Sequence, residues 1–269
     1  MMKPQRIFTV YFSAAGTTRR ACLTVARELA ALSGLVAETI DITAPSCRAK
    51  PLRFGEGDVV VFGVPVYSGR VPDILLPFFR DSLAGNGACA AALVTYGNRA
   101  YDGALYELGS LLTAAGFSVA AGAAVPAQHC FSASIAPGRP DGDDLSALRG
   151  LAARIHAKLA SDALTQPVLP GREAYEAALT APVSSGAPLP PPAADPRLCE
   201  GCCMCAVLCP VGAIPRHDPL TTTDSCIHCH ACITRCPRKA RRIDDDGYRA
   251  LVRKLEDLCR ERHEQEYYL

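Results

Sequence analysis

Two short runs of cysteine share one spacing in the second half of the chain. The 269 residues include 14 cysteines, and eight of them take the C positions of these runs. Each run reads C-x2-C-x2-C-x3-C-P, and the second begins 27 positions after the first. Six residues repeat at this one offset, which indicates an internal duplication. The matched pairs are Cys199 and Cys226, Cys202 and Cys229, Cys205 and Cys232, Cys209 and Cys236, Pro210 and Pro237, and Ala213 and Ala240.

Thiolates at this spacing are ligands for iron–sulfur clusters. Three cysteines on a tight loop can hold three corners of a cube, whereas the fourth lies on a further turn and completes the neighbouring cube. We therefore predict two [4Fe-4S] clusters with exchanged fourth ligands. The first cysteine set is Cys199, Cys202, Cys205 and Cys236, and the second cysteine set is Cys226, Cys229, Cys232 and Cys209.

Structural zinc is the alternative, because zinc also takes paired C-x2-C hooks. Two three-cysteine loops, each with a displaced fourth cysteine, favour iron–sulfur clusters. Cys203 is an additional thiol, which we interpret as a non-ligand, with ligation as the alternative. His228 and His230 flank Cys229. Because all eight cysteines are present, we interpret both histidines as groups around the cluster, and ligation of the Rieske kind is the alternative.

A hydroxyl-rich loop near the N-terminus is placed to bind phosphate. It follows an apolar run and precedes a helix-like stretch, where free N–H groups and the positive end of the helix dipole bind anions. The motifs G-x4-G-K-S/T and G-x-G-x-x-G are absent, which argues against a nucleoside triphosphate or a dinucleotide. A loop without Lys or Arg suits the monophosphate of FMN, and simple helix capping is the alternative. The loop residues are Ser13, Ala14, Ala15, Gly16, Thr17 and Thr18.

Two further loops follow the third and fourth predicted strands. Carboxyl ends of parallel strands meet at one sheet edge, so these loops and the N-terminal loop are expected to lie together. Tyr67 and either Tyr101 or Tyr96 are candidates to stack on a flat ring, and capping of the sheet edge is the alternative. The expected FMN contacts in these loops are Pro65, Val66, Tyr67, Ser68, Gly69, Thr95, Tyr96, Gly97, Asn98 and Tyr101.

Strand-like and helix-like stretches alternate over the first 165 residues, and this alternation has to position the loops. It predicts an α/β fold in which helices cover both faces of a parallel sheet. The predicted strands are 6–12, 36–42, 58–64, 89–95 and 119–125, and the predicted helices are 18–32, 72–84, 102–115 and 143–164.

These motifs resemble a known fused family. Residues 11–18, 62–72 and 96–102 are similar to a flavodoxin domain, and the cysteine runs are similar to a two-cluster bacterial ferredoxin. Their order resembles the ferrodoxin family, found mainly in anaerobes. The resemblance implies a flavodoxin-like doubly wound sheet of five parallel strands in the order 2-1-3-4-5, and a small α+β ferredoxin domain. Ala15 stands where flavodoxins usually have Thr, so one hydroxyl contact to phosphate is missing.

Composition and resemblance together divide the chain into four parts. We expect a flavodoxin-like FMN-binding domain at 1–165, a Pro-rich linker at 166–194, a two-cluster ferredoxin domain at 195–245 and a charged C-terminal helix at 246–269. The predicted function is passage of single electrons between the clusters and FMN, with redox proteins as donor and acceptor. The alternative is a flavin-dependent reductase of a small organic acceptor fed by its own clusters. His129 or Tyr101 would then donate a proton, and Cys130 is either a thiolate or a loop residue.

Charge and hydropathy exclude other classes. A formal net charge of +1 argues against a nucleic-acid binder. The chain has no apolar run of about 18 residues, so we expect no membrane span. The first apolar run has about six residues and is too short for a signal peptide, so we expect a reducing cytoplasm. The basic run of Arg235, Arg238, Lys239, Arg241 and Arg242 is either a docking patch or a solvated face.

Overall fold

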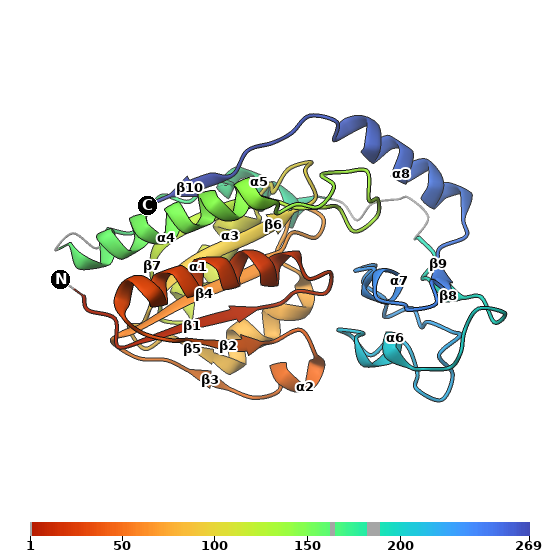
Figure 1. Ribbon diagram of the computed structural model, residues 1–269, viewed down its shortest axis with the longest axis horizontal. Helices are drawn as coiled ribbons and strands as arrows, with labels where there is room; N and C mark the ends of the chain where they lie inside the picture. The colour runs from red at the N-terminus through yellow and green to blue at the C-terminus, as the bar shows by residue number, and fades with distance from the viewer. Residues whose placement is uncertain (1, 162–164, 182–188) are drawn as a thin grey trace.

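The computed structural model describes residues 2–161, 165–181 and 189–269. Within these residues the centre is a six-stranded sheet (Figure 1) in the order β10-β7-β6-β4-β1-β2. Five of its strands run parallel and, counted in chain order, follow 2-1-3-4-5, the order of flavodoxin-like folds. The sixth strand, β10, runs antiparallel to β7. The strands are β1 Arg6–Tyr11, β2 Ala37–Asp41, β4 Asp58–Pro65, β6 Cys89–Tyr96, β7 Ser118–Pro126 and β10 Glu266–Tyr268.

The C-terminal segment corrects two predictions. The α/β fold with a mostly parallel sheet is confirmed, but the described sheet has six strands and not five. The predicted helix at 246–269 is too long, because α8 (Asp246–Leu258) ends well before the C-terminus. Just beyond its end, the side-chain amide of Asn98 donates to the carbonyls of Cys259 at 3.0 Å and Glu261 at 2.7 Å. These bonds take up backbone groups that a longer helix would use, and the chain continues extended into β10.

Helices cover both faces of the sheet, which buries its central strands β1, β4, β6 and β7. α1 (Thr17–Ser33) and α4 (Gly142–Ala160) pack side by side on one face, and α3 (Ala104–Ala114) packs on the other (Figure 1). Each face has its own apolar core. β4 is buried and apolar along nearly its whole length, as expected for a strand covered on both sides.

The predicted helix at 72–84 is wrong. The segment instead forms a 3₁₀ turn, η1 (Asp73–Leu75), a π-helical turn, η2 (Phe78–Ser82), and a short strand, β5 (Leu83–Ala84), which pairs with β3 (Leu52–Arg53). Pro77 lies between the two turns, and proline in a helix interior removes a hydrogen bond and clashes with the preceding turn.

The cysteine runs form a small unit at the loop end of the sheet. It contains α6 (Met204–Val207), α7 (Ala231–Thr234) and the antiparallel pair β8 (Ala193–Ala194) and β9 (Arg241–Arg242). The sequence repeat is also a backbone repeat. Left-handed residues occur 27 positions apart at Gly201 and His228, at Cys203 and His230, and at Gly212 and Lys239.

The predicted linker is divided between the two units, since its residues 166–181 lie on the flavodoxin-like unit whereas β8 belongs to the cysteine unit. Residues 182–188 of the linker lie outside the described residues, as do residues 162–164 of the predicted helix at 143–164. α5 (Arg172–Thr180) packs along α3, and the Arg70 guanidinium lies 4.8 Å from the ring centre of Tyr175. A further short helix, α2 (Pro45–Arg48), faces the cysteine unit, since the Arg48 guanidinium donates to the carbonyl of Pro210. Of the helices in the part of the chain that the structure describes, none has both the length and the apolarity needed to cross a bilayer.

Candidate functional site

A cavity of about 410 Å³ lies where the parallel strands end, and we call it the first cavity. The strand register brings the carboxyl ends of β1, β4 and β6 level, since Tyr11 pairs with Gly63 and Pro65 pairs with Thr95. The loops that follow these strands therefore converge, as the sequence analysis expects. Eleven of the expected FMN contacts line this cavity: Ala14, Ala15, Thr17, Thr18, Pro65, Val66, Tyr67, Ser68, Thr95, Tyr96 and Gly97.

Tyr67 and Tyr96 are the two tyrosines in the first cavity. The Tyr67 ring contacts the Phe12 ring edge-on at 6.4 Å between centres. Burial, with smaller contributions from Cys229 and Cys130, raises the pKa of Tyr67 well above its usual value, so the phenol stays protonated. Both rings thus offer neutral aromatic surface to a ligand.

Five expected contacts do not line the first cavity. The Tyr101 hydroxyl turns toward β10, where it donates to Glu266 at 2.8 Å and lies 3.0 Å from the Tyr268 hydroxyl. Asn98 is 2% exposed, and its side-chain amide donates to backbone carbonyls of the C-terminal segment. Gly69 faces Asp102, since a Cβ there would lie 2.6 Å from an Asp102 carboxylate oxygen. The other two are Ser13, whose hydroxyl accepts from the Arg19 N–H at 3.0 Å, and Gly16, which lines a neighbouring cavity.

The N-terminal loop presents an open helix end. Gly16 is the N-cap of α1 with a φ of 96° and has no side chain to cap the helix, and of the first-turn N–H groups that of Arg19 is taken up by the Ser13 hydroxyl. Thr18 is tied instead to the β6 end, with its hydroxyl 2.6 Å from that of Thr95. The first turn of α1 therefore keeps N–H groups and the positive helix dipole directed at the cavities.

The segment after β7 supplies a wall with chemically active groups. Gln128, His129, Cys130 and Phe131 line the first cavity. Burial lowers the pKa of His129, so the imidazole is neutral, and its Nδ1 accepts from the Phe131 N–H at 3.0 Å. Burial raises the pKa of Cys130 to about 12, so this group is a thiol at neutral pH and not a thiolate. A side chain at Gly97 would collide with the His129 ring, which explains glycine there.

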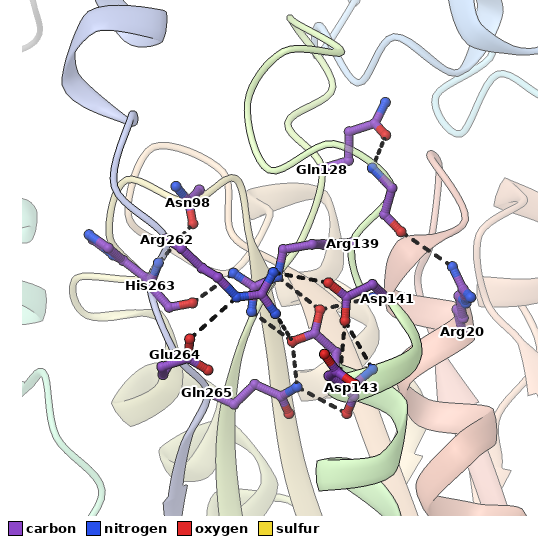
Figure 2. A network of polar contacts seen from close by, with 12 residues as sticks. Arg20, Asn98, Gln128, Arg139, Asp141, Asp143, Arg262, His263, Glu264 and Gln265 are labelled. Atoms are coloured by element: carbon purple, nitrogen blue, oxygen red, sulfur yellow. Dashed lines mark hydrogen bonds and ion pairs between the residues drawn. The ribbon is translucent and has the colours of Figure 1, made fainter.

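A buried polar network fixes this segment (Figure 2). Arg139 makes a two-pronged ion pair with Asp144 at 2.6 and 2.8 Å, and both side chains are about 3% exposed or less. Arg139 also donates to the carbonyl of His263 at 2.7 Å, and Arg262 pairs with Asp141 at 3.0 Å. The C-terminal segment thereby braces the loop that carries His129.

The cysteine unit closes the first cavity from the other side. Leu189, Ile227, His228 and Cys229 line it, together with Leu251 of α8. These contacts are not among the expected ones, and no local sequence signal could have revealed them, because they depend on how the two units dock.

Two small cavities in the cysteine unit separate the cysteines into sets. Cys199, Cys202, Cys205 and Cys236 line one, together with Cys203. Cys209, Cys226, Cys229 and Cys232 line the other. Each group contains three cysteines of one run and the fourth cysteine of the other. Among the described residues, no group of three or more His, Cys, Asp or Glu side chains converges tightly enough to hold a single metal ion.

Hydrogen bonds to sulfur also follow the repeat. The Ala213 N–H donates to Cys209 Sγ at 3.2 Å, and the Ala240 N–H donates to Cys236 Sγ at 3.3 Å, 27 positions later. Cys203 differs, because its thiol donates to the carbonyls of Gly201 at 3.3 Å and Arg216 at 3.4 Å. The Cys203 sulfur is therefore directed at backbone carbonyls.

Solved flavodoxins are similar to part of this chain, whereas no family model and no curated protein matches it. A flavodoxin from the domain Archaea is 15% identical, covers 58% of this chain and 100% of its own, and has a TM-score of 0.44. A flavodoxin of Streptococcus pneumoniae TIGR4 is 18% identical over 56% of this chain and 98% of its own, with a TM-score of 0.40. An NADH:FMN oxidoreductase in its apo form is 19% identical over 60% of this chain and 93% of its own, with a TM-score of 0.40. The fold assignment rests on the strand order described above.

Proposed function

We propose that this chain is an electron-transfer protein that holds two [4Fe-4S] clusters and FMN. The observation that carries the proposal is the position of Cys229, which lines both the first cavity and the cavity of the second cysteine set. A flavin site and a cluster site thus share one wall. When bound, such clusters exchange single electrons and FMN takes up one or two.

The first cavity supports FMN by its size and chemistry. Its volume of about 410 Å³ lies within the range of small-molecule sites. Tyr67 and Tyr96 offer aromatic surface at the ligand-binding edge of the sheet. The N-terminus of α1 offers N–H groups to a phosphate. The eleven lining residues named above are the proposed contacts.

The two cysteine sets support the clusters. Each set lines one cavity, and in each set a backbone N–H donates to a sulfur, as at Cys209 and Cys236. Such bonds tune the reduction potential of a cluster. We propose the flavodoxin-like unit at 1–165 and the ferredoxin-like unit at 195–245 as the two redox domains, joined by the linker at 166–194.

Redox proteins are the proposed donor and acceptor. The proposal places the chain in a reducing compartment such as the cytoplasm, because eight thiolates must stay reduced to hold the clusters. Cytoplasmic anaerobic metabolism fits this requirement, since oxygen attacks exposed thiolates.

A reductase of a small organic acceptor is the second candidate function. The specific observation in its favour is His129, whose neutral imidazole lines the first cavity. Because its Nδ1 accepts a hydrogen bond, its proton is on Nε2, which can exchange it with a bound acceptor. Tyr101 is not a donor in this scheme because its hydroxyl lies at β10. Turnover of a defined acceptor that is lost on His129→Phe, with FMN still bound, would favour this function over electron transfer alone.

Anoxic reconstitution tests the main proposal. Purified full-length chain supplied with iron, sulfide and FMN is expected to retain about eight irons and about one FMN. Cys209→Ala is expected to lose about half of the iron and keep its FMN, whereas Cys47→Ala, at an exposed cysteine outside the runs, keeps both. Flavin absorbance is then expected to bleach after reduction of the clusters in the unsubstituted chain. Zinc in place of iron, or no uptake of FMN, would overturn the proposal.

A further inference from the structure

A second cavity, of about 690 Å³, lies between the N-terminus of α1 and the cysteine unit. Residues of the N-terminal loop line it, namely Ala15, Gly16 and Thr17, and so does the segment from Gln128 to Ala133. Ala15, Thr17 and residues 128–131 also line the first cavity. The two cavities therefore share part of their walls.

The second cavity is positively charged. Arg20, Arg139, Arg235 and Arg242 line it, and none of its lining residues is Asp or Glu. Arg139 is held by Asp144, and Arg242 lies 3.3 Å from an Asp195 carboxylate oxygen. Within the described ranges, Arg20 and Arg235 have no carboxylate partner.

The Arg235 guanidinium lies over the helix end that the N-terminal loop forms. A Cβ built on Gly16 would lie 2.7 Å from Arg235 Nη2. Gly16 is the N-cap of α1, so a cation from α7's C-cap position faces the positive end of a helix. Like charges placed together in this way are unfavourable unless an anion lies between them.

A buried histidine in the same cavity lacks a partner. His230 is 2% exposed, and its Nδ1 lies 3.0 Å from the carbonyl of Cys130. Because a carbonyl only accepts, Nδ1 donates, and in the neutral ring Nε2 is then an acceptor. Nε2 has no hydrogen-bond partner among the described residues. A hydroxyl or N–H donor that reached Nε2 would satisfy it.

We propose that Arg235 of the cysteine unit binds the phosphate of FMN at the N-terminus of α1. The inference rests on the proposed function, and it adds a cation that the N-terminal loop itself does not contain. Phosphate supplies the anion between Arg235 and Gly16, and the polyol chain of FMN supplies hydroxyl donors for His230. The ferredoxin-like unit thus completes the flavin site of the flavodoxin-like unit.

Comparison of FMN with riboflavin, which lacks the phosphate, tests this inference in the reconstituted full chain. Arg235→Gln is expected to weaken FMN binding about tenfold and to leave riboflavin binding unchanged, since a hydrogen bond to a charged group is lost. Arg235→Lys, which keeps the charge, is expected to recover part of the loss. Arg216→Gln removes the same charge from an exposed position of the same unit that lines neither cavity, and FMN affinity is expected to stay unchanged.

The measurements separate this inference from the function on which it rests. Flavin fluorescence titrations give both affinities, and iron content checks that the variant unit is folded. Equal FMN affinity in Arg235→Gln and the unsubstituted chain overturns the role of Arg235 and leaves the proposed function standing. An equal loss for FMN and riboflavin also overturns it, because the phosphate is then not involved. If the unsubstituted chain does not bind FMN, the proposed function fails and this inference fails with it.

Discussion

Exchange of the fourth cysteine between the two runs can be tested with two double substitutions. Cys199 and Cys236 line the same small cavity, whereas Cys226 and Cys236 belong to one run but line different cavities. Replacing Cys199 and Cys236 by Ala damages only the first set, so about four of about eight irons are expected to remain. Replacing Cys226 and Cys236 by Ala removes one ligand from each set, so almost no iron is expected to remain.

Iron and acid-labile sulfide measured after anoxic reconstitution would give the answer directly. Electron paramagnetic resonance of the reduced protein adds a second readout, because two clusters in one chain interact and a single cluster does not. Cys203→Ala is the matched control, since the Cys203 thiol donates to two carbonyls, and it should keep the full iron content. The reasoning is refuted if the Cys226 and Cys236 pair keeps half of the iron while the Cys199 and Cys236 pair keeps none.

Four further predictions concern the first cavity and the residues that hold it in place. Arg139→Gln should destabilise folding by about 1.5–3 kcal/mol, because it removes the short charged bonds to the buried Asp144 carboxylate and leaves it a longer contact with Arg262 at 3.5 Å, and thermal unfolding would measure this. Burial opposes ionisation of Asp144, but bonds from Arg139 and Gln265 outweigh it and hold its pKa well below the usual range. The unsubstituted chain should therefore lose stability as pH falls below about 4, and the variant should lose less. Asn98→Ala should speed amide hydrogen exchange in β10 without changing exchange in β4, since it removes two buried bonds to the C-terminal segment. Tyr67→Leu should weaken FMN binding several-fold, whereas Tyr101→Phe should leave it unchanged, because of these two tyrosines only Tyr67 lines the first cavity. Equal effects of the two substitutions on FMN binding would contradict the proposal that FMN binds in the first cavity.

Local patterns were sufficient for the parallel sheet and for most of the first cavity. Asp58–Pro65 is apolar at almost every position because helices cover both faces of the sheet, and such a run predicts a buried parallel strand. The rule that loops after parallel strands share one edge then placed Tyr67 beside Tyr96. The 27-residue repeat in the sequence is also a repeat in the backbone, since Cys203 and His230 share a left-handed conformation.

Contacts that depend on docking could not be predicted. Tyr101 looked like a ring-stacking residue, but its hydroxyl is engaged by Glu266 and Tyr268 across 165 or more positions of sequence. The short run that forms β10 carries no strand signal of its own, because three residues are too few for a period of two. Arg235 belongs to a basic run that equally suits a solvated face, and only the fold places it over Gly16.

Several contacts hold the cysteine unit against the flavodoxin-like unit. The chain enters the unit at Leu189, which lines the first cavity, and leaves it through α8, whose Leu251 lines the same cavity. Between these two connections, His230 stacks on Phe131 at 4.5 Å between ring centres and bonds the carbonyl of Cys130. The Arg48 guanidinium donates to the Pro210 carbonyl at 2.6 Å. Undocking would break each bond at about 0.5–1.5 kcal/mol and expose the stacked rings. In this docked arrangement Cys229 stays in the wall that the first cavity shares with the cavity of the second cysteine set, so the proposed FMN and cluster sites are neighbours.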